Sequence, residues 1–423
     1  MQFDLESVRS QFPALSILDN GVRRIYFDNP AGTQVTATVA DAVSDCLLKK
    51  NANIGGYFAS STDADQVVES ARVAMADFLN APSPEEIVFG QNMTTITLHL
   101  SRSIGHMFGR GDEIIVSQMD HDANVWPWVL MARDMGLKIK WLPFNKETFE
   151  FDLDVVDALL TDRTRLLCVG GASNLTGTIN DVAAICAKAR AAGAMTYIDA
   201  VQSAPHVATD VQEIGCDFLV CSAYKFFGPH QGILWGRREL LEQLEPYKVR
   251  PAPEAIPGSF ETGTQSHEGI AGVAAIVDYF AWIGNTMARD YADRWSQFSG
   301  RRQAVHAAMD FLFDYERSLA ERLIDGLMHI SGVTVQGITA ADAMQRRVPT
   351  VSFTHDSVAS AAIAESLARQ NIFVWSGHNY AVEVAKTLGI YETGGAVRIG
   401  PVHYNSHQEV DELLTALAGI VTA

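Results

Sequence analysis

A lysine in an apolar, aromatic segment is the first residue of this sequence whose type and setting suggest chemistry. Lys225 lies in Ser222-Ala-Tyr-Lys-Phe-Phe-Gly-Pro229, directly after an apolar run that predicts a strand. Burial lowers the pKa of a lysine, and a neutral amine can form a Schiff base with a carbonyl group. Taken alone, the segment could equally hold an ordinary loop lysine.

An acidic residue ends the preceding predicted strand. Asp199 closes the run Thr196-Tyr-Ile-Asp199, where it could cap the next helix or act as a carboxylate at the sheet edge. One strand–helix–strand unit separates it from Lys225, so the two side chains could converge on one ligand. Pyridoxal phosphate needs both groups, a lysine for its aldehyde and an acid for its pyridine nitrogen.

Three further segments carry polar side chains beside predicted strands. Met93, Thr94 and Thr95 begin a helix, where free N–H groups and hydroxyls can bind phosphate, although threonine is also a common N-cap. His121 follows a strand and could stack on a planar cofactor or be structural. Asn174 stands in a turn after a strand, where it could donate a hydrogen bond to a phenolate oxygen.

The elements that must position these residues alternate along the chain. Seven apolar runs predict strands at 87–89, 113–117, 138–142, 165–170, 195–199, 218–222 and 232–236. Amphipathic stretches between them, such as 182–192, predict helices. Strands that alternate with helices indicate an α/β domain with a mostly parallel sheet.

The C-terminal part has a different pattern. Residues 274–331 are largely helical by pattern, with a possible break at Gly300, and predict a long connecting helix. The elements predicted beyond it are strands at 347–354 and 396–399 and helices at 357–369 and 406–421. We therefore expect three parts: an N-terminal arm (1–25) that packs on the small domain, a large domain (26–290) and a small C-terminal domain (291–423).

Composition excludes several classes of protein. The 423 residues carry a formal net charge of −18, which argues against nucleic acids and anionic membranes as partners. No apolar run reaches the roughly 18 residues of a membrane span, and residues 1–9 lack the apolar core of a secretory signal. The five cysteines show no CxxC spacing, so neither a disulfide framework nor a metal site is expected. These features predict a cytoplasmic enzyme.

The order of these motifs resembles the class V aminotransferase family of fold type I pyridoxal phosphate enzymes, in its cysteine desulfurase and selenocysteine lyase branch. The likeness runs from Tyr26-Phe-Asp-Asn-Pro-Ala-Gly32 to Arg398. It implies an α/β fold with a mostly parallel seven-stranded sheet in the large domain and a smaller α+β C-terminal domain. It also implies pyridoxal 5′-phosphate as the cofactor.

The resemblance implies a role for each matching residue. Lys225 would carry the cofactor as a Schiff base, Asp199 would pair with the pyridine nitrogen and His121 would stack on the ring, and these three would be catalytic. The other cofactor contacts would be Met93, Thr94, Thr95, Asn174, Gln202, Ser222 and Tyr224. Tyr224 is a departure, because the family usually has histidine before the lysine.

Two further segments extend the resemblance. Phe260-Glu-Thr-Gly-Thr264 is similar to the segment that reaches the phosphate of the neighbouring subunit, so Gly263 and Thr264 would bind the cofactor across a homodimer with shared active sites. Arg398 is similar to the strand arginine that holds the substrate carboxylate, a role that suits its planar guanidinium. By itself it could be a surface arginine. Asn29 would line the substrate side.

The loop Trp375-Ser-Gly-His-Asn-Tyr-Ala381 departs most from the family. The matching desulfurase loop reads like Arg-Thr-Gly-His-His-Cys-Ala, and its cysteine carries the substrate sulfur as a persulfide. Here Tyr380 stands in the cysteine's place, His378 is kept, and no cysteine follows Cys221. Since a tyrosine hydroxyl cannot form a persulfide, desulfurase chemistry of that kind is not expected. His378 and Tyr380 would contact the substrate.

The combined prediction is a cysteine desulfurase-like enzyme that acts on a small amino acid. The first hypothesis is a β-eliminating lyase that breaks a C–S bond without a persulfide nucleophile. The alternatives are a class V aminotransferase or an amino-acid epimerase, which the same site could support. A non-catalytic protein that binds the cofactor is a hypothesis of a different class.

Overall fold

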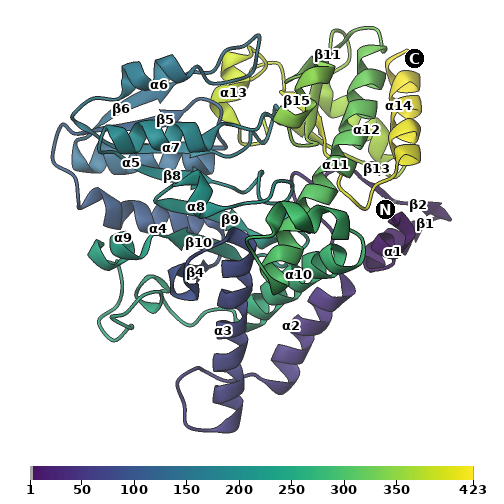
Figure 1. Ribbon diagram of the computed structural model, residues 1–423. Helices are drawn as coiled ribbons and strands as arrows, with labels where there is room; N and C mark the ends of the chain where they lie inside the picture. Colours follow the sequence, from purple (N-terminus) through teal and green to yellow (C-terminus); the bar gives the residue numbers. More distant parts are fainter. Residues whose placement is uncertain (1–2, 423) are drawn as a thin grey trace.

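Seven strands form the central sheet of the structure, a computed structural model that describes residues 3–422 (Figure 1). Their order in space is β4-β10-β9-β8-β7-β5-β6. Strand β10 is antiparallel to β4 and β9, and the other neighbours are parallel, so the predicted mostly parallel sheet is confirmed. The strands are β4 (Ile87–Gly90), β5 (Glu113–Ser117), β6 (Lys138–Leu142), β7 (Thr164–Gly170), β8 (Met195–Asp199), β9 (Phe218–Ser222) and β10 (Gly232–Gly236).

Helices cover both faces of this sheet, which explains its nearly continuous apolar strands. Successive strand residues point to opposite faces. In β5, Ile114 and Val116 therefore pack with α4 (Met93–Gly105) and α5 (Trp126–Met135), while Ile115 joins the core on the other face. That second core contains α3 (Ala59–Leu79), α7 (Val182–Ala191) and α10 (His267–Thr286).

A second, antiparallel sheet lies in the C-terminal part (Figure 1). Its strands follow the order β11-β12-β15-β14. They are β11 (Val333–Gln336), β12 (Val351–His355), β14 (Trp375–Gly377) and β15 (Ala396–Ile399). Helices α12 (Ser360–Ala368) and α14 (His407–Val421) pack on this sheet, close to the bounds predicted for them.

One predicted strand begins later than expected. The pattern predicts a strand at 347–354, but β12 begins at Val351. Proline has no N–H group to donate to a ladder, and Pro349 stands two residues before this start. Arg347 pairs instead with Thr178 in an isolated antiparallel bridge. The first half of the predicted strand therefore joins the small sheet to a loop of the large one.

Helix α11 (Gly300–Met328) is the predicted long connection. Gly300 has φ = +61°, a left-handed conformation that favours glycine, and it marks the expected break after α10. Ala304 and Val305 pack in the core of the seven-stranded sheet, whereas Leu319 and Leu323 pack in that of the small sheet. The helix thus belongs to both cores, and the division into domains at about residue 290 stays a proposal.

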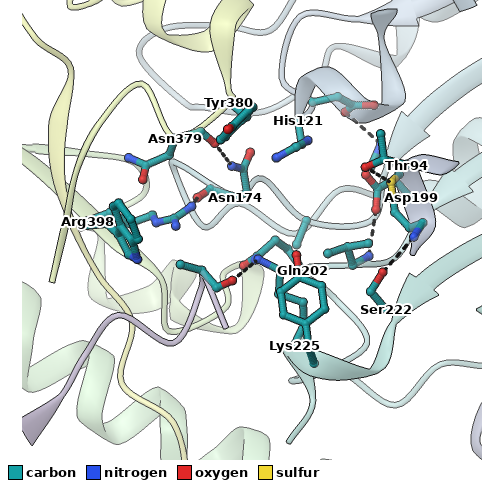
Figure 2. Close-up of a pocket in the computed structure, with 18 of the residues that line it drawn as sticks. Thr94, His121, Asn174, Asp199, Gln202, Ser222, Lys225, Asn379, Tyr380 and Arg398 are labelled. Carbon is teal, nitrogen blue, oxygen red and sulfur yellow. Dashed lines mark hydrogen bonds between the residues drawn. The ribbon is translucent and has the colours of Figure 1, made fainter. Parts of the chain in front are cut away.

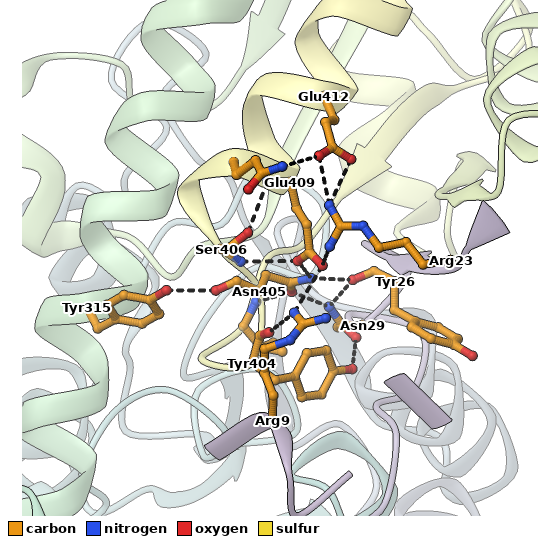
Figure 3. Close-up of polar contacts among 12 residues, drawn as sticks. Arg9, Arg23, Tyr26, Asn29, Tyr315, Tyr404, Asn405, Ser406, Glu409 and Glu412 are labelled. Carbon is orange, nitrogen blue, oxygen red and sulfur yellow. Dashed lines mark hydrogen bonds and ion pairs between the residues drawn. The ribbon is translucent and has the colours of Figure 1, made fainter. Parts of the chain in front are cut away.

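The N-terminal segment contacts the beginning of α14 (Figure 3). Arg9 and Arg23 both bind Glu409, at 3.0 Å each, and Arg9 also donates to the carbonyl of Tyr404. Strand β3 (Ile25–Tyr26) pairs in parallel with β13 (Ile372–Phe373). These contacts fix the start of the loop 28–32, which reaches the functional site described below.

No single helix in residues 3–422 is long and apolar enough to cross a membrane.

Candidate functional site

A cavity of about 870 Å³ lies at the carboxyl ends of β7, β8 and β9, beside strands β14 and β15 of the small sheet (Figure 2). In an open α/β sheet, ligands bind at this edge because the loops after the strands meet there. The predicted site residues that line the cavity are Met93, Thr94, His121, Asn174, Asp199, Gln202, Ser222, Tyr224, Lys225, His378, Tyr380 and Arg398. The fold thus brings together residues that lie far apart in the sequence.

Three of the predicted cofactor contacts lie outside this cavity. Thr95 is exposed on the first turn of α4, where its backbone N–H donates to the side chain of Asn92. Gly263 and Thr264 are exposed in the loop before α10. Their predicted contact with a neighbouring subunit stays a proposal.

Asn29 also lies outside the cavity, and the substrate role predicted for it stays a proposal. Its side-chain nitrogen donates to the carbonyls of Tyr26 (3.0 Å) and Gly400 (2.6 Å), and its oxygen accepts from the hydroxyl of Tyr404 (Figure 3). The residue is buried. Because both ends of the amide are bonded within the chain, Asn29 joins the N-terminal segment to β15 and its following loop.

Lys225 projects from the short helical turn after β9 into the cavity (Figure 2). Its amine donates to the carbonyls of Pro30 (2.5 Å) and Ala31 (3.0 Å). Burial, together with the nearby positive charge of Arg398, lowers the pKa of this amine to about 7. A large share of the amine is therefore neutral near pH 7, the state that attacks an aldehyde.

Asp199 closes β8 beneath the cavity and is buried. The N–H of Val201 donates to its Oδ1 at 2.9 Å. Burial raises the pKa of the carboxyl to about 7. A buried carboxylate of this kind is stabilised as an anion by a cationic partner, and a protonated pyridine nitrogen is such a partner.

The N-terminus of α4 lies at one end of the cavity and is suited to bind an anion. The N–H of Met93 donates to Ser222 Oγ at 3.1 Å, which places a strand-end hydroxyl beside the first turn of the helix. Thr94 lines the cavity next to it. Hydroxyl groups and the positive end of a helix dipole are usual components of a phosphate site, and both are present here.

Several buried polar atoms in the cavity have no hydrogen-bond partner in residues 3–422. They are Oδ1 of Asn174, Oε1 of Gln202 and Nε of Arg398. Burial lowers the pKa of the Arg398 guanidinium to about 10, although Nη1 donates to the carbonyl of Asn174 at 3.0 Å. Unsatisfied buried groups cost free energy, so these atoms are suited to a polar ligand. Nε of Arg398 can donate to an anionic group, and the two amide oxygens can accept from a donor of the ligand. Together with Lys225 and Asp199, they fit pyridoxal phosphate and an amino acid.

The ring of His121 is fixed and uncharged. Its Nδ1 accepts the N–H of Ala123 at 3.0 Å, and its ring stacks on Tyr380 with centroids 5.4 Å apart and planes at 18°. Burial lowers the pKa of the imidazole to about 3. A neutral, flat ring at this place can stack on the planar ring of a cofactor.

Some residues that line the cavity had no predicted role. Asp120 is buried beside His121 and accepts hydrogen bonds from Ser117, Asn124 and the N–H of Gly170. His230 stacks on Tyr224, with centroids 4.8 Å apart and planes at 13°. Sequence spacing alone does not show that His230 lies at the cavity, because its position depends on the pairing of β10 with β9.

The five cysteines are all buried and unbonded to one another. Within residues 3–422, none of them lines the cavity. Cys221 is the one nearest to Lys225 in sequence, yet its side chain belongs to the apolar core beneath β9. Burial raises the pKa of its thiol strongly, which disfavours the thiolate needed of a nucleophile.

Comparison with known proteins adds to this geometry. The family model for aminotransferase class V matches residues 25–302 and 304–413. A cysteine desulfurase of Yersinia pestis (strain Pestoides F) is 31% identical over 435 residues, covering 99% of this chain and 99% of that protein.

Solved structures are similar over the same length. The apo structure of a cysteine desulfurase from Thermococcus onnurineus NA1 has a TM-score of 0.86 and 29% identity, covering 100% of this chain and 99% of that one. A cysteine desulfurase from Escherichia coli has a TM-score of 0.83 and 27% identity, with the same coverage.

Proposed function

The chain belongs to the class V aminotransferase family of pyridoxal phosphate enzymes, and from this premise we propose that it is a lyase that breaks the C–S bond of a small, cysteine-derived amino acid. In this proposal the sulfur leaves the site as part of a released product and is never carried by a cysteine of the protein. One observation supports the proposal most strongly: no cysteine lines the cavity in residues 3–422, and Tyr380 lies at its mouth.

Nine residues of the cavity contact the cofactor in this proposal. Met93, Thr94 and Ser222 bind the phosphate, Asp199 faces the pyridine nitrogen, His121 stacks on the ring and Lys225 holds the cofactor's aldehyde. The remaining cofactor contacts are Asn174, Gln202 and Tyr224. When bound, pyridoxal phosphate supplies an electron sink for the bonds at the substrate's Cα.

Lys225 is the group that moves the proton. Its amine, with a pKa lowered to about 7, can accept the Cα proton of the substrate in its neutral form. Arg398 binds the substrate carboxylate and so orients Cα toward that amine. The ring of His121 remains neutral and shields one face of the site from water.

Loss of the Cα proton, departure of the sulfur from Cβ and hydrolysis by one water give pyruvate, ammonia and sulfide from cysteine. The sulfur keeps both electrons of the C–S bond and leaves as sulfide, so no oxidant is needed. An aminotransferase or an epimerase would use the same residues but would leave the C–S bond intact.

Two further parts of the proposal concern the assembly and its location. We place the active sites in a homodimer, in which Gly263 and Thr264 of the exposed loop before α10 reach the partner's phosphate site. We place the enzyme in the cytoplasm, where its five unpaired cysteines stay reduced.

The test of the reaction is a product assay with the holoenzyme. Cysteine and related amino acids are supplied one at a time, and pyruvate, ammonia and sulfide are measured. Equal amounts of pyruvate and ammonia are expected. Alanine as the carbon product would contradict elimination, and a new keto acid formed only with an amino acceptor would indicate transamination.

Replacing Asp199 by alanine is expected to weaken cofactor binding by about 10- to 100-fold, because a charge-assisted hydrogen bond to the pyridine nitrogen is lost. The dissociation constant of pyridoxal phosphate can be measured by titration of the apoprotein. Asp134→Ala, a change at an exposed carboxylate, is the matched control. An unaltered dissociation constant in Asp199→Ala would remove this residue from the cofactor site.

Replacing Cys221 by serine is expected to leave kcat/KM within about twofold, since its buried thiol with a raised pKa is a poor nucleophile. Cys221→Ala serves as a second variant in case the buried hydroxyl impairs folding. Steady-state rates of pyruvate release provide the measurement. A loss of 100-fold or more in both folded variants would mean that Cys221 takes part in the reaction.

A further inference from the structure

Two large aromatic side chains lie at the mouth of the cavity. Trp375 is 52% exposed and Tyr380 is 67% exposed, and both line the same cavity as Lys225 and Arg398. Figure 2 shows Tyr380 and Arg398 at the side of the cavity away from Thr94 and Ser222. The aromatic rings therefore border the substrate end of the site.

The backbone that carries Tyr380 is held in an unfavourable conformation. Asn379 has φ = +51° and Tyr380 has φ = +58°, both in the left-handed region. Asparagine adopts this region more readily than most residues, but a tyrosine there is strained. Strain of this kind persists only where the surroundings impose it, and it is concentrated at ligand sites.

Contacts on both sides impose this conformation. Asn174 Nδ2 donates to the carbonyl of Asn379 at 2.7 Å, and the N–H of Asp122 donates to the carbonyl of Tyr380 at 2.8 Å. The N–H of Tyr380 donates to Nδ1 of His378 at 3.0 Å. With its ring stacked on His121, Tyr380 is thus positioned before any substrate binds.

Trp375 is placed by the small sheet. It is directly opposite Arg398 in the antiparallel pair β14–β15. Opposed residues of such a pair project from the same face of the sheet. The indole therefore lies beside the guanidinium proposed to bind the substrate carboxylate.

The charge of the lining also restricts the substrate. Within residues 3–422, Lys225 and Arg398 are the only lysine and arginine that line the cavity, and the proposal gives both of them a partner. The mouth offers aromatic faces instead of a second cation. A neutral, apolar substituent is the chemistry that such a surface binds.

We propose that the substrate is an S-substituted cysteine, a thioether whose apolar or aromatic substituent packs against Trp375 and Tyr380. This inference rests on the proposed function and names its substrate class. The Cα–H and Cβ–S bonds break, the substituted thiolate leaves with the electron pair and is protonated, and one water is consumed. The products are a thiol R–SH, pyruvate and ammonium, with no change in the total number of electrons.

The first test compares two substrates of the holoenzyme, S-phenyl-cysteine and free cysteine. We expect kcat/KM to be at least about 10-fold higher for S-phenyl-cysteine, with thiophenol and pyruvate released in equal amounts. A higher kcat/KM for free cysteine would overturn the substrate class and leave the lyase proposal standing.

The second test asks whether the two rings cause the preference. Trp375→Ala and Tyr380→Ala are each expected to lower the ratio of the two kcat/KM values by about 10-fold. Trp141→Ala, which removes a partly exposed tryptophan from edge strand β6, is the control and should leave the ratio unchanged. If neither cavity variant changes the ratio of the two kcat/KM values, the inference is overturned. This holds even if the variants change the oligomeric state.

The third test separates binding from chemistry. Homophenylalanine carries CH₂ in place of the sulfur of S-phenyl-cysteine and has no leaving group, so it reports affinity alone. Its dissociation constant from the holoenzyme should be about 10-fold or more below that of 2-aminobutyrate, and Trp375→Ala should abolish the difference. If no amino acid yields pyruvate but this difference in dissociation constants is found, the proposed lyase reaction is wrong and the proposed apolar binding surface is supported. Equal dissociation constants in the unaltered enzyme would overturn the surface.

Discussion

Replacing Lys225 by alanine is expected to lower turnover by about 1,000-fold or more. The change removes both the amine that holds the cofactor and the base that accepts the Cα proton, and general base catalysis alone contributes about 10²- to 10⁴-fold. The measurement is the steady-state rate of pyruvate release with saturating pyridoxal phosphate. Borohydride treatment followed by mass spectrometry should join the cofactor to Lys225 in the unaltered enzyme.

Lys138→Ala is the matched control, because this lysine is exposed at the start of β6 and away from the cavity. It should keep full activity and covalent labelling. Labelling of any lysine other than 225, or a Lys225→Ala rate within tenfold of the unaltered enzyme, would contradict the assignment.

Replacing Arg398 by alanine is expected to reduce kcat/KM by roughly 30- to several-thousand-fold, mainly through KM. A buried, charge-assisted clamp on a carboxylate contributes about 2–5 kcal/mol. Arg398 is buried, and among residues 3–422 its guanidinium donates one identified hydrogen bond, to the carbonyl of Asn174, so it can bind an incoming carboxylate.

Two comparisons make the Arg398 result specific. Arg398→Lys keeps the charge but not the planar fork and should recover only part of the affinity. Arg322→Ala, at an exposed ion pair with Asp411, should leave both constants unaltered. Equal KM and kcat/KM in Arg398→Ala and the unaltered enzyme would exclude the clamp.

Much of the fold could be predicted because apolar runs mark the strands of this sequence and polar residues mark the ends of those runs. The strands are buried on both faces, so each is a short apolar run, and the polar residue after the run marks the carboxyl edge of the sheet. Asp199, Ser222 and Asn174 are such residues, and all three line one cavity. Their convergence follows from parallel strands, which place these ends at the same edge.

The errors have physical causes as well. The strand predicted from residue 347 begins at 351, because Arg347 pairs with a loop of the large sheet, and no local pattern shows a partner so distant in sequence. Strands β11 and β14 were not predicted, since they are short and partly exposed. The hydrogen bonds of Asn29 could not be predicted from its motif, because they depend on the position of Tyr404 in the folded chain.

Only some features of the loop that carries Tyr380 could be predicted from the sequence. The missing cysteine is plain in the sequence and led to the lyase hypothesis. The left-handed backbone of Asn379 and Tyr380, and the stacking of Tyr380 on His121, arise from contacts with distant segments and required the structure.

Trapping of persulfides tests the central claim most directly. The holoenzyme is incubated with cysteine, alkylated, digested and mapped by mass spectrometry at all five cysteines. We expect pyruvate and sulfide to form while no cysteine carries more than a trace of persulfide. A stoichiometric persulfide on any of the five, released by added thiol at the rate of turnover, would contradict the lyase proposal and identify a desulfurase.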